Sequence, residues 1–316
     1  MEVTQGAPFE SFGLSEATMR AIRNKHYTVS TPVQAGCIPP MLAGKDVIAK
    51  APTGTGKTMA FGIPIIERID PDSEEVQAVI LAPTRELAMQ ITDEMRDIAV
   101  CHEGVRLVCL YGGQPIGKQI DALKKHPQIV VATPGRLSDH MKRRTVKLDN
   151  VKTVVLDEAD RMLDMGFSDD IMKIVSYMPR ERQTIMFSAT LPPKIRELAK
   201  TILRNPAEVN IAISKPNEAI DQSAYICYES QKLGIIRELF AEPTDSKTII
   251  FSSSKLKVKE LAHTLKRMKL EVAAMHSDLE QPQREEVMLN FKNNKVKILV
   301  ATDIVARGID IEDIGL

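Results

Sequence analysis

The sequence has no excess of charge of either sign and no long hydrophobic run. Lys and Arg together number 42, Asp and Glu also number 42, and the net charge of the 316-residue chain is zero. A neutral chain has no overall electrostatic attraction for nucleic acid or anionic lipid, so any nucleic-acid site must be a local groove. No apolar run approaches the roughly 20 residues that a membrane-spanning helix needs. We therefore expect a soluble globular protein.

The chain also lacks a cysteine motif and a targeting segment. Cys37, Cys101, Cys109 and Cys227 are not spaced as metal ligands or as a redox pair. Unpaired thiols of this kind predict a reducing compartment. Residues 1–12 lack the basic stretch and apolar core of a signal peptide. The unpaired thiols and the lack of a signal peptide predict a cytoplasmic protein. No repeat or low-complexity segment is evident, and we expect a monomer.

Short β-branched runs alternate with helical patterns from about residue 47 onward. The expected strands of the first half are 47–51, 79–82, 106–110, 129–133, 153–156 and 184–187. Between them, apolar residues recur at helical spacing, as in Leu87, Ile91, Met95 and Ile98. Continuous apolar strands separated by helices predict an α/β fold, with a parallel sheet that is covered on both faces.

A polar, Pro-containing segment at 214–219 interrupts this alternation after the run 209–213. The alternation then restarts, with expected strands at 224–228, 248–251, 271–274 and 297–301. We therefore predict a first domain at 1–213, a linker at 214–220 and a second domain at 221–316. In parallel sheets of this kind, ligands bind in the loops that follow the strands.

A glycine-rich segment follows the first expected strand and opens a helix. Its residues are Ala51, Pro52, Thr53, Gly54, Thr55, Gly56, Lys57 and Thr58. Glycines let backbone N–H groups turn toward phosphate oxygens, and the helix N-terminus and Lys57 add positive charge. The hydroxyl of Thr58 is placed to ligate Mg²⁺. Ala51 stands where the P-loop pattern has Gly, and a plain strand-to-helix turn is the alternative interpretation.

Adjacent carboxylates, Asp157, Glu158 and Asp160, end another apolar strand. Asp157 would hold Mg²⁺, and Glu158 would orient or deprotonate the attacking water. Alone, such an acidic cluster is more often a helix N-cap, where it also suits the helix dipole. A phosphate loop on the same sheet favours the catalytic interpretation.

The order of these motifs resembles the DEAD-box RNA helicase family of superfamily 2, with Asp-Glu-Ala-Asp at 157–160 as its signature. The resemblance implies two RecA-like domains in tandem. It also implies ATP and Mg²⁺ as ligands, single-stranded or duplex RNA as the partner, and hydrolysis coupled to local unwinding. The alternative is a helicase of a sister family that translocates along DNA. Gln34 and the Asp-Glu-Ala-Asp sequence at 157–160 disfavour it.

Upstream residues resemble the adenine-reading motif of this family. The resemblance implies that Gln34 contacts the base edge, that Phe9 helps to cover the base and that Tyr27 belongs to the same site. His26 stands where Gly is usual, and Ser30 stands where Pro is usual.

Residues that resemble the RNA-contact motifs follow expected strands in both halves. They are Pro83, Thr84, Arg85, Gly113, Thr133, Arg136, Ser252, Arg284 and Thr302. Hydroxyl, amide and guanidinium groups bind phosphate and sugar, so the implied RNA binding is largely independent of sequence. Taken singly, each of these residues also fits a loop cap or a turn.

Three further matches complete the resemblance. Ser188 and Thr190 match the motif that couples ATP to strand separation, and the resemblance implies that Arg307 and Asp310 reach the nucleotide. Ser277 replaces the usual Gly after His276, which is also compatible with a hydrogen-bonded histidine at a strand end.

The resemblance also implies a later strand and a His-Arg-x-Gly-Arg-x-x-Arg motif, and the printed sequence stops at Leu316. That motif supplies an arginine finger, a group worth roughly 10³–10⁵ in rate, or about 4–7 kcal/mol of barrier. We therefore expect residues 1–316 to bind ATP and Mg²⁺ and to hydrolyse ATP slowly. The alternative to a helicase core is an ATP- and RNA-binding module with little or no turnover.

Overall fold

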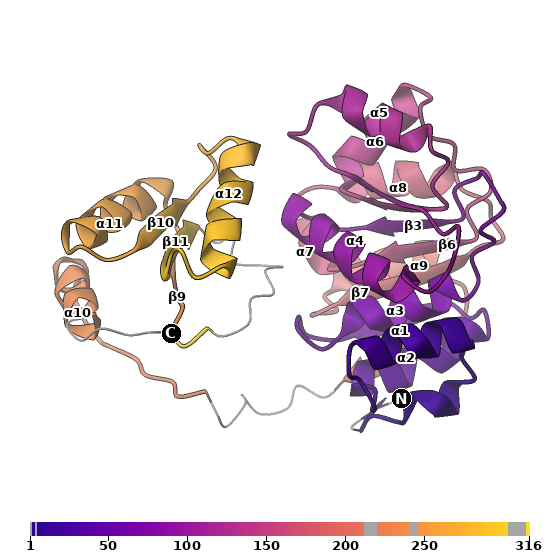
Figure 1. The fold of residues 1–316 in the computed structure, drawn as a ribbon, viewed down its shortest axis with the longest axis horizontal. Coiled ribbons are helices and arrows are strands. Elements are labelled where there is room, and N and C mark those ends of the chain that lie inside the picture. Colours follow the sequence, from indigo (N-terminus) through magenta and orange to yellow (C-terminus); the bar gives the residue numbers. More distant parts are fainter. Residues whose placement is uncertain (1, 4, 212–219, 241–245, 303–313) are drawn as a thin grey trace. The chain divides into compact units, whose positions relative to one another are not determined.

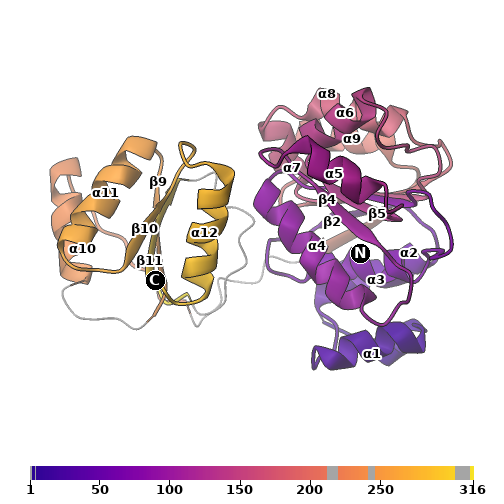
Figure 2. The same ribbon diagram turned by 45° about the horizontal axis from the view of Figure 1, so that its top comes forward.

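The computed structural model describes residues 2–3, 5–211, 220–240, 246–302 and 314–316. The chain divides into two compact units, Met1–Ser214 and Lys215–Leu316. Each unit has a parallel β-sheet with helices packed against it (Figures 1 and 2). The predicted fold class, two parallel-sheet α/β domains in tandem, is therefore confirmed.

The sheet of the first unit has the strand order β1-β8-β2-β7-β6-β3-β5-β4. Its strands are β1 (Glu2–Val3), β2 (Val47–Lys50), β3 (Ala78–Leu81), β4 (Leu107–Leu110), β5 (Ile129–Ala132), β6 (Thr153–Leu156), β7 (Gln183–Ser188) and β8 (Ala207–Ile211). All neighbouring strands in this sheet pair in parallel, so their carboxyl ends meet at one edge.

Helices cover both faces of this sheet. They are α1 (Glu16–Asn24), α2 (Pro32–Leu42), α3 (Lys57–Ile66), α4 (Arg85–Ala99), α5 (Ile116–Leu123), α6 (Pro134–Lys142), α7 (Ala159–Asp164), α8 (Ser168–Ser176) and α9 (Pro193–Ile202), with a 3₁₀ helix η1 (Phe9–Phe12) before them. Successive strand residues face opposite sides, so Ile80 joins the core under α2, α3 and α4, whereas Val79 and Leu81 join the core under α5 to α9. In Figure 1, α1 to α3 lie at the bottom of this unit and α5 and α6 at the top.

The second unit has a sheet of order β10-β11-β9. Its elements are η2 (Glu229–Gln231), α10 (Lys232–Leu239), β9 (Thr248–Ser252), α11 (Lys255–Arg267), β10 (Val272–Met275), α12 (Gln281–Lys292) and β11 (Ile298–Thr302). Val258 and Leu265 of α11 pack on one face, and Phe291 of α12 packs on the other. At the outer edge of β9, the backbone N–H of Ile249 donates to the carbonyl of Leu316 at 2.9 Å.

Nine of the ten expected strands lie where apolar runs predicted them, with ends shifted by a few residues at most. The expected strand at 224–228 is wrong, because these residues pair with no described strand. Tyr225, Ile226 and Tyr228 are exposed, so no described residue buries the apolar face that a strand would need. The predicted linker at 214–220 lies outside the described residues except for Ile220. In the described residues, no helix is long and apolar enough to cross a membrane.

His26 explains why Gly is usual at its position in the family that the sequence resembles. Its φ is 58°, in the left-handed region that costs an L-residue roughly 1–2 kcal/mol. The side chain is exposed. Replacing His26 with Gly is therefore expected to raise the free energy of unfolding by up to about 1 kcal/mol, after the extra entropy of an unfolded Gly is subtracted.

Urea unfolding of the two proteins measures this effect. Lys118→Gly, an exposed helical position in α5, is the matched control and should instead lose about 1 kcal/mol. A loss of stability in His26→Gly would show that the imidazole makes a contact that outweighs the backbone strain.

Candidate functional site

Three predicted motifs lie together at the carboxyl edge of the first sheet. The glycine-rich loop follows β2, Asp157 follows β6 and Ser188 ends β7. These strands are neighbours in the order β2-β7-β6. Parallel pairing therefore brings segments that are more than 100 residues apart in sequence to one place, as ligand sites in such sheets require.

The loop at 51–58 is shaped by its glycines. Gly54 and Gly56 have φ values of 77° and 85°, and Gly56 is the N-cap of α3. A Cβ built on Gly54 meets no atom within 4 Å, so the space above the loop is open there. A Cβ on Gly56 would lie 2.6 Å from the side-chain nitrogen of Gln34. Open space in front of a helix N-terminus suits an anion.

Lys57 has one charged neighbour in this site. Its Nζ lies 3.3 Å from Oδ1 of Asp157, and both side chains are buried, at 7% and 3% exposure. The contact does not have hydrogen-bond geometry, and Nζ has no other hydrogen-bond partner among the described residues. A buried ammonium group with unused donors is costly, so the site fits a ligand that would accept from it.

Glu158 is held from two sides at the start of α7. Its Oε1 accepts a hydrogen bond from the hydroxyl of Thr53 in the loop at 3.1 Å. Its Oε2 lies 3.2 Å from a guanidinium nitrogen of Arg161. The backbone of Glu158 has φ 51°, a strained value that is common at functional sites. The carboxylate is thereby fixed next to the phosphate loop.

Asp160 connects the acidic motif to the end of β7. Its Oδ2 accepts hydrogen bonds from the backbone N–H of Thr190 at 2.9 Å and from the Thr190 hydroxyl at 2.7 Å. The backbone N–H of Asp160 donates to the hydroxyl oxygen of Ser188 at 3.3 Å. Ser188 and Thr190 therefore contact the acidic motif, which suits positioning residues.

Gln34 bonds to the phosphate loop and to its own helix terminus. Its side-chain nitrogen donates to the carbonyl of Gly56 at 3.1 Å, and its oxygen accepts from the N–H of Thr31 at 2.9 Å. Thr31 and Gln34 form a capping box, a helix-start pattern that can be recognised in the sequence. The ring of Phe9 is 1% exposed and packs edge-on against Phe12 in the core. Tyr27 is 48% exposed. Base contacts by these residues stay predictions.

The departures from the family pattern have local reasons. Ala51 has a negative φ, so this position does not require Gly. The N–H of Ser30 donates to the carbonyl of Ala7 at 2.8 Å, a bond that Pro could not make. The Ser30 hydroxyl oxygen also accepts from the N–H of Ala7 at 2.9 Å. Ser277 is exposed and its φ is not positive, so the side chain is accommodated.

Predicted RNA-contact residues of the first unit follow β3, β4 and β5. Thr84 is the N-cap of α4, after β3, and the turn at Gly113, φ 92°, follows β4. Thr133 is the N-cap of α6, after β5. Pro83 precedes Thr84 and Arg85 begins α4. The order β2-β7-β6-β3-β5-β4 thus places these residues beside the phosphate loop and carboxylates on one edge.

A buried polar network that the sequence analysis missed holds Arg136. The guanidinium of Arg136 donates to the carbonyl of Gln114 and to the side-chain oxygen of Gln119, each at 3.0 Å. Nε2 of His140 lies 3.0 Å from the same oxygen of Gln119. Burial lowers the pKa of His140 from its ordinary 6.5, and nearby Arg136 lowers it further. Gln119 belongs to no short sequence motif, so its role could not be predicted from the sequence.

Predicted residues of the second unit also lie at strand ends. Ser252 ends β9, Thr302 ends β11, and His276 follows β10. Burial lowers the pKa of His276, and its Nδ1 has no hydrogen-bond partner among the described residues. Arg284 is half-buried on α12. Arg307 and Asp310 lie outside the described residues.

Comparison with known families decides the class of this site. The profile of the DEAD/DEAH box helicases matches residues 31–198, more than half of the chain. The chain belongs to the DEAD/DEAH-box helicase family. A second profile, the helicase conserved C-terminal domain, matches residues 231–316. The glycine-rich loop, the acidic motif and Ser188 at the carboxyl edge of the first sheet lie within the residues that the first profile matches.

Two similar proteins from bacteria are named as ATP-dependent RNA helicases. The chain is 45% identical over 307 residues to the ATP-dependent RNA helicase CshA of Limosilactobacillus reuteri, covering 97% of this chain and 62% of the relative. It is 44% identical to the DEAD-box ATP-dependent RNA helicase CshA of Bacillus subtilis, with the same coverage. The chain thus spans about three-fifths of the length of these relatives.

Solved structures of the family agree in fold. Saccharomyces cerevisiae Dbp5 bound to RNA and ADP-BeF3 matches with a TM-score of 0.88 at 31% identity, covering 97% of this chain and 78% of Dbp5. A DEAD box protein of the hyperthermophile Methanococcus jannaschii matches with a TM-score of 0.63 at 38% identity, covering 98% of this chain and 84% of that protein.

Proposed function

We propose that this chain is the core of an ATP-dependent RNA helicase, which binds ATP with Mg²⁺ and couples hydrolysis to local unwinding of RNA duplexes. The observation that carries the proposal is the continuous row of helicase motifs along one sheet edge. Predicted nucleotide residues lie at the ends of β2, β7 and β6, and predicted RNA residues lie at the adjoining ends of β3, β5 and β4. The names of the CshA relatives and the RNA-bound Dbp5 structure support it.

The nucleotide site follows from the residues that line it. Backbone N–H groups at 54–58 and the ammonium of Lys57 would hold the phosphates. Mg²⁺, which neutralises phosphate charge when bound, would be held by the Thr58 hydroxyl and Asp157. Groups of three or more metal-ligating side chains are absent from the described residues. A site with one carboxylate suits Mg²⁺, which keeps several waters and binds with substrate phosphates.

Glu158 is the group that we assign to the attacking water. Its carboxylate is fixed by Thr53 and Arg161 and faces the loop that would carry the phosphates. A carboxylate held in this way can accept a proton from water or orient it. Gln34 on α2 donates a hydrogen bond to Gly56 of the same loop, so a change of the loop on nucleotide binding would be transmitted to α2.

RNA is proposed to bind through its phosphates and sugars. The predicted contacts in the first unit are hydroxyl, backbone and guanidinium groups, which carry no sequence information. Binding should therefore vary little with RNA sequence and should weaken as salt is raised. A cytoplasmic location and a monomeric state stay predictions.

The first test is ATP hydrolysis by residues 1–316 with and without single-stranded RNA, together with binding of a fluorescent ATP analogue. RNA-stimulated hydrolysis supports the helicase proposal. Binding of both ligands without stimulated turnover supports the alternative, an ATP- and RNA-binding module. Equal stimulation by single-stranded DNA and RNA would contradict an RNA-specific motor.

Gln119 gives a sharper test of the RNA surface. Replacing Gln119 with Ala removes one of two recorded acceptors for Arg136, so RNA affinity should fall about threefold to tenfold, or roughly 1 kcal/mol for a lost hydrogen bond. ATP affinity should not change. Fluorescence anisotropy with a labelled RNA measures the effect, and Lys118→Ala on the exposed face of α5 is the control for the local helix. Unchanged RNA affinity would contradict the proposal that Arg136, held by Gln119, contacts RNA.

A further inference from the structure

A cavity of about 810 Å³ lies at the opposite edge of the first sheet from the helicase motifs. Its lining comes from Arg68, which follows α3, and from residues that precede or begin β2, β6, β7 and β8, which are neighbours in the order β8-β2-β7-β6. These strands have four to six residues, so about 13–20 Å of strand separates the cavity from the carboxyl ends. The cavity is therefore distinct from the nucleotide site.

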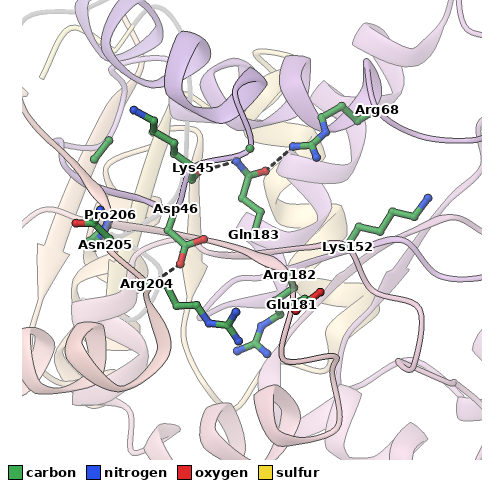
Figure 3. Close-up of a pocket in the computed structure, with 12 residues that line it drawn as sticks. Lys45, Asp46, Arg68, Lys152, Glu181, Arg182, Gln183, Arg204, Asn205 and Pro206 are labelled. Atoms are coloured by element: carbon green, nitrogen blue, oxygen red, sulfur yellow. Dashed lines mark hydrogen bonds between the residues drawn. The ribbon is translucent and has the colours of Figure 1, made fainter.

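The lining is strongly basic. Its positively charged residues are Lys45, Arg68, Lys152, Arg182 and Arg204, against the carboxylates of Asp46 and Glu181. In the part of the chain that the structure describes, none of the five basic side chains forms a salt bridge. Figure 3 shows the guanidinium groups of Arg182 and Arg204 side by side, with Lys45 and Lys152 extending outward.

The nearby carboxylate of Asp46 is already engaged by the backbone. Its Oδ1 accepts from the N–H of Thr184 at 2.8 Å, and its Oδ2 accepts from the N–H of Arg204 at 2.6 Å. Asp46 thus ties the starts of β2, β7 and β8 together and makes no ion pair with either guanidinium. The fold holds two arginines next to each other without a carboxylate between them.

Arg182 has donor capacity that the protein does not use. One terminal nitrogen donates to the carbonyl of Pro179 at 2.6 Å, whereas the buried Nε has no hydrogen-bond partner among the described residues. Burial lowers the pKa of the Arg182 guanidinium, Arg204 lowers it further, and Asp46 partly opposes the shift. Arg204 donates through one terminal nitrogen to the carbonyl of Arg180. An anion in the cavity would relieve the repulsion between the two guanidinium groups.

We propose that this cavity is an oxyanion site that binds a small polyphosphate through Arg182 and Arg204. Guanidinium forks match phosphate oxygens, and Arg is favoured wherever such recognition is needed. None of the twelve lining residues is aromatic, and the only apolar ones are Gly44, Pro206 and Ala207. The cavity therefore offers neither a stacking surface for a base nor an apolar pocket for a peptide side chain. A compact, highly charged phosphate compound fits it best.

Calorimetric titration of pyrophosphate, without Mg²⁺, tests the proposal in the Lys57→Ala background, which weakens the phosphate loop as a competing site. We expect one binding event that Arg182→Met and Arg204→Gln each weaken at least tenfold, since a charge-assisted hydrogen bond is lost. Arg204 is exposed, so its variant tests the site even where Arg182→Met fails to fold. Arg180→Gln is the matched control, because this exposed arginine adjoins the cavity without lining it.

Circular dichroism first establishes that the Lys57→Ala variant is folded. No binding in that folded background, or equal weakening in Arg180→Gln, would overturn the proposal. A second arm replaces pyrophosphate with a short single-stranded RNA. RNA affinity that is unchanged by Arg204→Gln assigns the site to a small phosphate compound. RNA affinity that falls as much as pyrophosphate affinity would overturn that assignment and identify RNA phosphates as the source.

Discussion

Replacing Lys57 with Ala is expected to weaken ATP binding about 100-fold. The ammonium group is buried, faces Asp157 at 3.3 Å and has no other hydrogen-bond partner among the described residues. Its donors are thus available to phosphate oxygens in front of the helix N-terminus at Gly56. Charge-assisted hydrogen bonds contribute about 1.5–3 kcal/mol each, and about 3 kcal/mol corresponds to a 100-fold change in Kd.

The same substitution has a structural cost that must be separated from affinity. Asp157 is 2% exposed and would lose its charged neighbour. Breaking a buried pair costs about 3–5 kcal/mol of stability. We expect a loss at the low end of this range, because Asp157 still accepts a hydrogen bond from the backbone N–H of Glu158 at 3.0 Å. Circular dichroism therefore has to establish that the variant is folded at the assay temperature.

Thermal shift with an ATP analogue reports binding directly. A ligand at 100 times its Kd stabilises the folded state by about 2.7 kcal/mol, so Tm should rise in the parent chain and stay almost constant in the variant. Lys57→Met should behave as Lys57→Ala does, because it keeps the length and removes the charge. Lys173→Ala, an exposed lysine on α8, is the control. An affinity within threefold of the parent would contradict the phosphate-loop assignment.

The parallel sheet could be predicted because its strands are buried on both faces. β3 and β5 are apolar at every position, which only a sheet between two helical layers explains. The segment 224–228 is also apolar, with Tyr225, Ile226 and Tyr228, yet these side chains are exposed and the segment pairs with no described strand. Composition reports that a segment suits a strand, whereas pairing depends on a neighbour far away in sequence.

The phosphate loop, the acidic motif and the predicted RNA-contact residues could be located because each follows or ends an apolar run that predicts a strand. Their mutual contacts could not: the sequence analysis did not predict that Thr53 donates to Glu158 or that Asp160 accepts from Thr190. Gln119 has no motif and becomes visible only through its bonds to Arg136 and His140.

The basic cavity was invisible in the sequence for a related reason. Its basic residues come from just after α3 and from just before four separate strands, and the neutral total charge conceals a local excess. Arg182 and Arg204 are brought together by the pairing of β7 and β8 on either side of β2. Sheet order, rather than a local pattern, creates that site.

Replacing Glu158 with Gln is expected to lower the rate of ATP hydrolysis by roughly 10²–10³-fold while ATP binding changes little. General acid–base groups contribute about 10²–10⁴ in rate, and an amide can neither accept the proton nor keep the negative charge that orients water. Gln has the same shape, and its oxygen can still accept from the hydroxyl of Thr53. Lys57, Asp157 and the loop that hold the nucleotide are untouched.

Single-turnover phosphate release in the presence of RNA measures the chemical step, and the fluorescent ATP analogue measures binding. Glu197→Gln, an exposed carboxylate on α9, is the matched control. Thr53→Ala removes one of the two contacts of Glu158 and should lower the rate less than Glu158→Gln does, because Arg161 still holds the carboxylate. Turnover of Glu158→Gln within threefold of the parent would show that Glu158 takes no part in the chemical step. Joint loss of binding and turnover would instead assign Glu158 to the support of the phosphate loop.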